Sequence, residues 1–162
     1  MRTPTILLAA VTMLGAGTGA PPFAPATDMA KDWPGAWTCV LTASNQRQPT
    51  TYPVEAATYG KWLRLSASVP AAAGRPANRF IYLTTYDSAA KKWFNISYST
   101  SGQFQVSNSS AGPDAVRQTW TYIYPLDPNS EPGTIVMGPA SLDSYHAHGN
   151  RVAFHTSCTK RT

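Results

Sequence analysis

Short runs of β-branched and aromatic residues recur along the chain, and residues suited to turns separate them. After Lys31, no window of a dozen residues repeats its apolar side chains with the 3.6-residue period of a helix. Eight or nine short strands at regular spacing, without long helices between them, favour an antiparallel barrel or sandwich over a parallel sheet. The runs that we predict as strands are 33–41, 52–58, 61–68, 79–86, 91–98, 103–107, 116–124, 134–137 and 151–157.

The N-terminus has the pattern of a secretory signal peptide. Met1 and Arg2 give a positive start, residues 6–14 are apolar, and residues 15–26 are mostly small. The apolar stretch is too short to cross a bilayer. Pro21 disfavours cleavage after Ala20, so we predict cleavage after Ala26. Residues 1–26 are then a signal peptide, residues 27–162 form one domain that begins with a short helical turn over 27–31, and the product is secreted or periplasmic.

Export determines how we interpret the two cysteines, Cys39 and Cys158. In an oxidising compartment two thiols with none left over most simply form one bridge. The Cα atoms of a disulfide lie within about 7 Å of each other. The first and last strands must therefore be neighbours, as they are when an antiparallel sheet closes into a barrel.

Charge gives little indication of a partner. The net charge is +5, but the basic residues are scattered along the chain and only 13% of residues are charged. A nucleic-acid-binding protein would gather its basic residues into a patch or stripe. We therefore expect no nucleic acid partner. We also expect a monomer and, because no other segment is long and apolar enough, no transmembrane segment.

Gly35, Ala36 and Trp37 open the first predicted strand directly behind the predicted helical turn. This arrangement resembles the Gly-x-Trp signature of the lipocalins and the wider calycin group, and the mature chain resembles small exported bacterial barrels of that type without an assigned activity. The resemblance implies an up-and-down barrel whose first and last strands pair, with Gly35 and Trp37 at its closed end. Residues 85–87 differ from the Thr-Asp-x signature of true lipocalins, so the resemblance extends to the architecture and not to the carrier branch.

Aromatic residues on separate strands are the best candidates for a binding site. Successive side chains of a strand point to opposite faces, so Gln118, Trp120 and Tyr122 share one face of their strand. A small barrel is either filled by its own side chains or holds one small ligand, so these aromatic residues are either core packing or the wall of a cavity. On strand 61–68 the inner face is ambiguous, although charge places Arg64 outside and favours a neutral pocket. The candidate ligand-binding residues are Trp62, Tyr82, Trp93, Trp120 and Tyr122.

Histidine and serine chemistry is less well supported. We expect His146 and His148 in a solvated loop, and His155 on the last strand with its ring on the face opposite Phe154 and Cys158. The set Ser141, Asp143, Ser144 and His146 contains the residue types of a hydrolase triad, but no Gly-x-Ser-x-Gly elbow accompanies it. We therefore assign no catalytic residue, metal ligand or cofactor.

These patterns lead to a secreted protein that binds a small, partly apolar molecule inside a barrel. Two alternatives stay open. One is a protein or polysaccharide interaction module with a filled barrel, and the other is a haem-binding barrel or a barrel enzyme.

Overall fold

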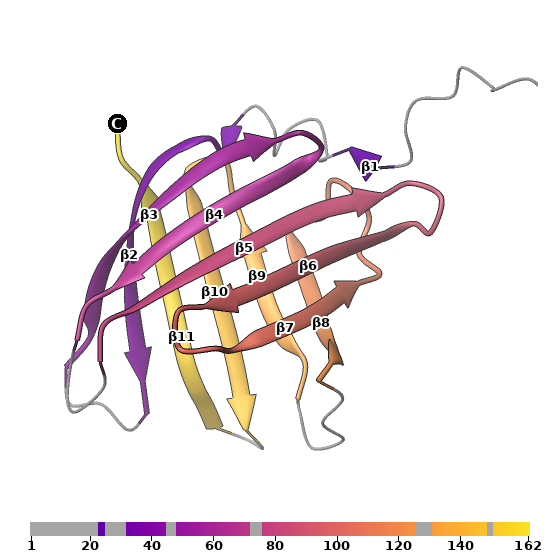
Figure 1. Ribbon diagram of the computed structural model, residues 1–162. Coiled ribbons are helices and arrows are strands. Elements are labelled where there is room, and N and C mark those ends of the chain that lie inside the picture. Colours follow the sequence, from indigo (N-terminus) through magenta and orange to yellow (C-terminus); the bar gives the residue numbers. More distant parts are fainter. Residues whose placement is uncertain (1–22, 25–31, 45–47, 72–75, 126–130, 149–150) are drawn as a thin grey trace, which may run out of the picture.

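In the computed structural model, the described residues are 23–24, 32–44, 48–71, 76–125, 131–148 and 151–162, and their regular elements are all β-strands (Figure 1). Ten antiparallel strands close a barrel, and a two-residue strand, β1, pairs with the end of β5. The bounds are β1 Phe23–Ala24, β2 Gly35–Ala43, β3 Thr50–Tyr59, β4 Trp62–Val69, β5 Asn78–Asp87, β6 Lys92–Ser99, β7 Phe104–Ser109, β8 Arg117–Tyr124, β9 Gly133–Met137, β10 Ser141–His148 and β11 Arg151–Lys160.

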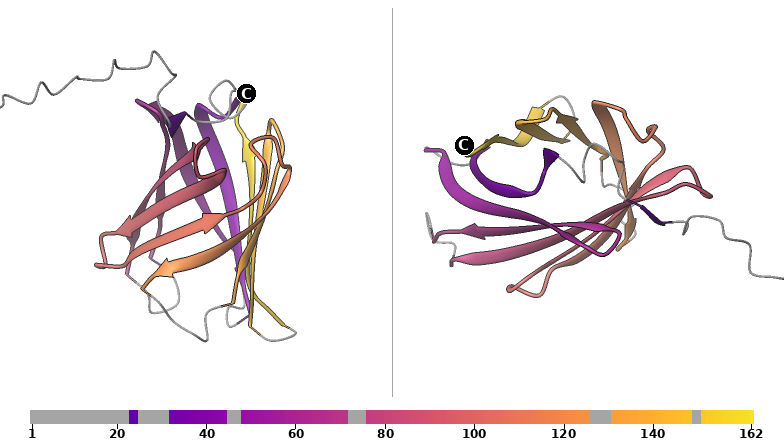
Figure 2. Two further views of the ribbon diagram at one scale, coloured as in Figure 1. Left: turned by 90° about the vertical axis from the view of Figure 1, so that its right-hand side faces the viewer. Right: turned by 90° about the horizontal axis from the view of Figure 1, so that it is seen from above.

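The barrel strands follow a simple meander. Each strand from β2 to β10 pairs with the next one along the chain, and β11 returns to β2. Strands β4–β7 cross β9–β11 at a steep angle, so the barrel is flattened into two facing layers (Figures 1 and 2). This architecture confirms the closed antiparallel barrel that the spacing of the strands predicted.

The count of eight or nine barrel strands was wrong, because the described chain has ten. The additional strand is β10, whose C-terminal half we expected to be a loop. Its inner-facing positions Leu142, Ser144 and His146 are mainly polar, so the strand lacks the usual alternation of apolar and polar residues. The helical turn expected over residues 27–31 lies outside the described residues. In the part of the chain that is described, we find no helix with the length and apolar character needed to span a membrane.

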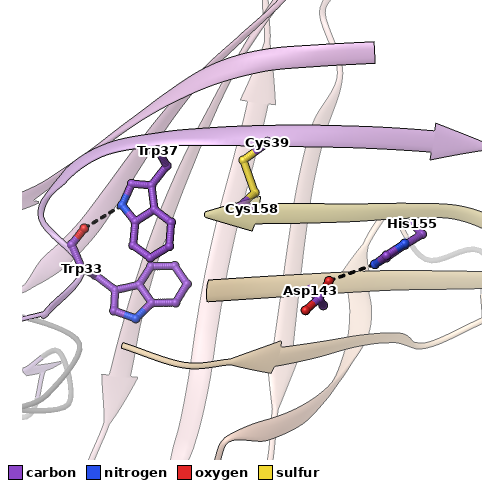
Figure 3. Close-up of a disulfide and its surroundings, with 6 residues drawn as sticks. All are labelled: Trp33, Trp37, Cys39, Asp143, His155 and Cys158. Carbon is purple, nitrogen blue, oxygen red and sulfur yellow. Dashed lines mark hydrogen bonds and ion pairs between the residues drawn. A yellow bond between two sulfur atoms is a disulfide. The ribbon is translucent and has the colours of Figure 1, made fainter. Parts of the chain in front are cut away.

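The pairing of β2 with β11 closes the barrel, and the predicted disulfide joins these two strands. Cys39 and Cys158 are directly opposite each other in the register, with their Cα atoms 4.0 Å apart (Figure 3). The prediction of this bridge is confirmed. Both cysteines of the chain are used in it.

Tryptophans fill the barrel at the start of β2. The Trp37 indole N–H donates a hydrogen bond to the Trp33 carbonyl oxygen at 3.0 Å, and the two ring centroids are 5.0 Å apart (Figure 3). Gly35 has a φ of +132°, a backbone conformation that residues other than glycine rarely adopt. A Cβ there would also lie 3.2 Å from Lys160 Cε, while the Lys160 ammonium group bonds the Asp32 carbonyl oxygen. We call this region the sealed end.

Candidate functional site

The register of the strands decides which side chains face the lumen, the space enclosed by β2–β11. Leu65 of β4 is opposite Tyr82 of β5, and Tyr82 is opposite Ser97 of β6, so these three share the inner face. Trp62 and Arg64 have the other parity and lie on the outer face, whereas Leu63 and Leu65 belong to the core. Among the predicted binding residues, Trp62 is therefore separated from the other four.

Trp93 and Trp120 face inward but belong to the packed core with Trp33 and Trp37. Trp93 is completely buried, and its indole N–H donates to the Gly112 carbonyl oxygen at 3.1 Å. The Trp93 and Tyr86 rings meet edge to face, with the centroids 5.3 Å apart. These contacts give Trp93 a packing role. Trp120 is also buried, but its indole N–H has no hydrogen-bond partner among the described residues.

Three tyrosines and a histidine form the most polar group in the lumen, which we call the lumen cluster: Tyr52, Tyr82, Tyr122 and His146. Burial raises the pKa of all three phenols, and this shift is large for Tyr82. Charge on Tyr52 or Tyr122 would raise the Tyr82 pKa further, so the three phenols are electrostatic neighbours. A hydrogen bond with Thr156 partly offsets the effect of burial on the Tyr52 pKa.

His146 occupies a stacked position against the wall of the lumen. Its ring lies between Phe154, at a centroid distance of 4.3 Å, and Tyr122, at 5.9 Å. The Tyr122 hydroxyl is 3.3 Å from His146 Nδ1. Burial lowers the pKa of His146, so the imidazole is neutral at pH 7.

Sequence reasoning identified Tyr82 and Tyr122 but not Tyr52 and His146. Tyr52 begins a run that we predicted as one of the weaker strands, and we expected His146 in a loop. One signal could have found His146. The segment 141–148 is eight residues long, the length of a strand, and turn residues bound it at Gly138–Pro139 and at Gly149–Asn150.

The remaining inner surface of β6 and β7 is lined by small hydroxyl and amide side chains. Thr84 Oγ1 donates to Asn95 Oδ1 at 3.0 Å, and Asn95 Nδ2 reaches Ser107 Oγ at 3.5 Å. On the inner faces of β3, β4, β5 and β6, the described side chains include no Asp, Glu, Lys or Arg. The part of the lumen that these four strands line is therefore uncharged.

Several side chains that face the middle of the lumen are partly exposed. Leu65, Tyr82, Ile135 and Ser144 lie near the centres of their strands and face inward, and each keeps some exposure to solvent. Trp33, Trp37 and Trp93 are buried by comparison.

His155 lies on the outer face, away from the lumen. Its Nε2 atom is 3.0 Å from Asp143 Oδ1 (Figure 3). Its ring stacks on Tyr145 at a centroid distance of 4.4 Å and an angle of 3°. On β10, Asp143 faces outward while Ser144 and His146 face inward. The residue types of a hydrolase triad are thus divided between two faces. The described residues contain no group of three or more His, Cys, Asp or Glu side chains placed to hold a metal ion.

The outer surface has two hollows and one aromatic patch. A hollow of about 450 Å³ lies where β3 and β4 separate beyond the pair Val54–Ala67, and Pro53, which has no N–H to donate, lines it. A second, of about 310 Å³, lies between β7 and β8 around Arg117. The outer aromatic patch consists of Tyr98, Phe104 and Tyr124.

Comparison with known proteins gives structural neighbours only. No family model and no curated protein matches the chain. A de novo designed fluorescence-activating β-barrel is similar in structure, with a TM-score of 0.49 and 12% identity over 83% of this chain and 98% of that one. A redesigned β-barrel has a TM-score of 0.44 and 8% identity over 86% of this chain and 97% of its own.

Proposed function

We propose that this protein is an exported, lipocalin-like barrel that binds a small, partly apolar molecule in its lumen. The observation that carries the proposal is the partial exposure of inner-facing side chains at mid-barrel, among them Leu65, Tyr82 and Ile135. A ligand site is usually a largely apolar concave surface with a few convergent polar groups. The apolar surface of Leu65 and Ile135 beside the lumen cluster has this composition.

In such a carrier, the sealed end and the lumen cluster would have different roles. The sealed end is packed by tryptophans, so it supplies rigidity and closes the bottom of the site. The lumen cluster would supply hydrogen-bonding groups. In this proposal Tyr82 and Tyr122 keep the binding roles that the sequence assigned, whereas Trp62 lies on the outer face and Trp93 is completely buried.

A fluorescence titration with the apolar dye N-phenyl-1-naphthylamine tests the proposal. We expect saturable enhancement with one site per chain. Leu65→Trp places an indole in the lumen and should abolish binding, whereas Leu83→Trp makes the same change on the outer face of the neighbouring strand and should not. Circular dichroism confirms that both variants fold. Unsaturable enhancement in the wild type, or equal binding by the two variants, would remove the lumen as the site.

The outer aromatic patch supports a second candidate, an interaction module. Tyr98 is opposite Phe104 in the register, the Phe104 and Tyr124 centroids are 5.8 Å apart, and all three side chains are exposed. Exposed aromatic residues that lie together are typical of recognition surfaces. Tyr98→Ser with Phe104→Ser should abolish binding to a partner or polysaccharide and leave dye binding in the lumen unchanged.

A further inference from the structure

Tyr82 and Tyr122 of the lumen cluster differ in their hydrogen bonding. The Tyr122 hydroxyl is 3.3 Å from His146 Nδ1. The Tyr82 hydroxyl has no hydrogen-bond partner among the described residues. Tyr82 nevertheless lies at the centre of β5, opposite Leu65 and Ser97 on the inner face. It therefore offers an unused O–H donor in the middle of the lumen.

The charged side chains of the strands next to Tyr82 lie on the outer face. Arg64 of β4 is one of them, and Glu55 of β3 pairs outside the barrel with Arg161 at 3.2 Å. A buried anion needs a cation or several hydrogen-bond donors to offset its loss of hydration. The inner faces of β3, β4, β5 and β6 offer no cation beside Tyr82.

We infer that the lumen accepts an uncharged, partly apolar ligand with a carbonyl or similar acceptor oxygen, and that Tyr82 donates the hydrogen bond that anchors this oxygen. This inference rests on the proposed binding in the lumen and adds the chemical class of the ligand. The apolar side chains of Leu65 and Ile135 contact its hydrocarbon part. Carboxylic acids are disfavoured beside Tyr82, because the inner faces of β3, β4, β5 and β6 supply no counter-charge for their anions.

Three naphthalene dyes of similar size test the acceptor oxygen and the charge of the ligand separately. Prodan is neutral and has a ketone, N-phenyl-1-naphthylamine is neutral and has none, and 8-anilinonaphthalene-1-sulfonate adds an anionic group to that second dye. The emission of prodan also reports hydrogen bonding to its carbonyl. We expect the wild type to bind both neutral dyes and to bind the sulfonate at least about tenfold more weakly, because the charge must be desolvated.

Tyr82→Phe tests the anchoring role directly, because it removes the hydroxyl and keeps the ring. The Kd for prodan should rise about five- to tenfold, the size expected for one hydrogen bond, and its bound emission should move to shorter wavelength. The Kd for N-phenyl-1-naphthylamine should stay within about twofold, which a general disturbance of the lumen would not allow. Tyr59→Phe, the same change at an exposed tyrosine on the outer face, is the control and should alter neither dye.

The outcomes distinguish this inference from the proposed function. Equal effects of Tyr82→Phe on the two neutral dyes, or no effect on prodan, would overturn the anchoring role while binding in the lumen stands. Sulfonate binding as tight as that of its neutral counterpart would overturn the uncharged class. Failure of the wild type to bind any of the three dyes would overturn the proposed function, and this inference with it.

Discussion

Gly133 of β9 provides the space that the His146 ring of β10 occupies. The two residues are directly opposite each other in the register, and a Cβ built at residue 133 would lie 2.8 Å from His146 Cε1 and 3.0 Å from Nε2. Real Cβ atoms essentially never approach other atoms below 3.0 Å. The glycine is therefore required by its neighbour, and the position of His146 between Phe154 and Tyr122 depends on it.

Gly133→Ala should lower the free energy of unfolding by about 1–3 kcal/mol, the usual cost of overpacking a filled site. His146→Ala should remove most of that cost, so the two changes will not be additive in a double-mutant cycle. Urea unfolding of the four proteins measures the coupling. Gly112→Ala is the matched control, because a Cβ at residue 112 has no neighbour within 4 Å. Additive losses would show that the two residues do not compete for the same space.

His146 should also make the fold sensitive to acid. Burial lowers its pKa in the folded protein below the ordinary histidine value of 6.5, which we take for the unfolded chain. Below pH 6.5 His146 is protonated in the unfolded chain but still neutral in the folded protein. The free energy of unfolding therefore falls as the pH falls from 6.5 towards the lowered pKa. Below the lowered pKa this contribution levels off. Above pH 6.5 the residue contributes no pH dependence.

Urea midpoints between pH 8 and pH 4.5 check this expectation. His146→Phe keeps an aromatic ring in the stack and should flatten the loss of stability directly below pH 6.5. His155→Phe makes the same replacement on the outer face, where the side chain is partly exposed, and should leave that part of the profile in place. Identical profiles for His146→Phe and the wild type would assign the acid sensitivity to other groups.

The sequence predicts the parts of this fold that depend on apolar alternation and turn residues. Leu63, Leu65 and Ala67 alternate with exposed or polar residues and form a regular core strand, and charge alone places Arg64 outside. The pairing of the first strand with the last follows from two cysteines, because a disulfide constrains the separation of the strands that it joins. The alternation is a local signal, and the pairing of the first and last strands rests on one covalent bond.

The lumen cluster could be only half predicted, because a polar lumen reverses the alternation that identifies strands. On β10 the inward residues Ser144 and His146 are as polar as the outward Asp143. Hydrophobicity therefore cannot tell the two faces apart. The contact of Tyr52 with Thr156 joins strands that are distant in sequence and follows from register, which a single sequence does not determine.

Export itself leads to a prediction about the N-terminus. If residues 1–26 are a signal peptide, N-terminal sequencing of the exported protein should begin at Thr27. The strand β1, which pairs Phe23 and Ala24 with Asp87 and Tyr86, would then be absent from the mature barrel. Placing Pro at the small residue Ala26, the last before the cleavage site, should slow processing and leave a longer product. Exported material that begins at Met1 would contradict the signal peptide.

The Cys39–Cys158 bridge should contribute to stability mainly through the unfolded chain. It spans 119 residues, and the chain-entropy model assigns about 4–5 kcal/mol to a loop of that length. Seven residue pairs also join β2 to β11, so the reduced protein should fold at low urea with a lower midpoint. Cys39→Ala with Cys158→Ala should show the same loss and no response to reductant. A wild-type midpoint that reductant leaves unchanged, or full thiol labelling of the native protein without denaturant, would show that the bridge does not hold the barrel closed.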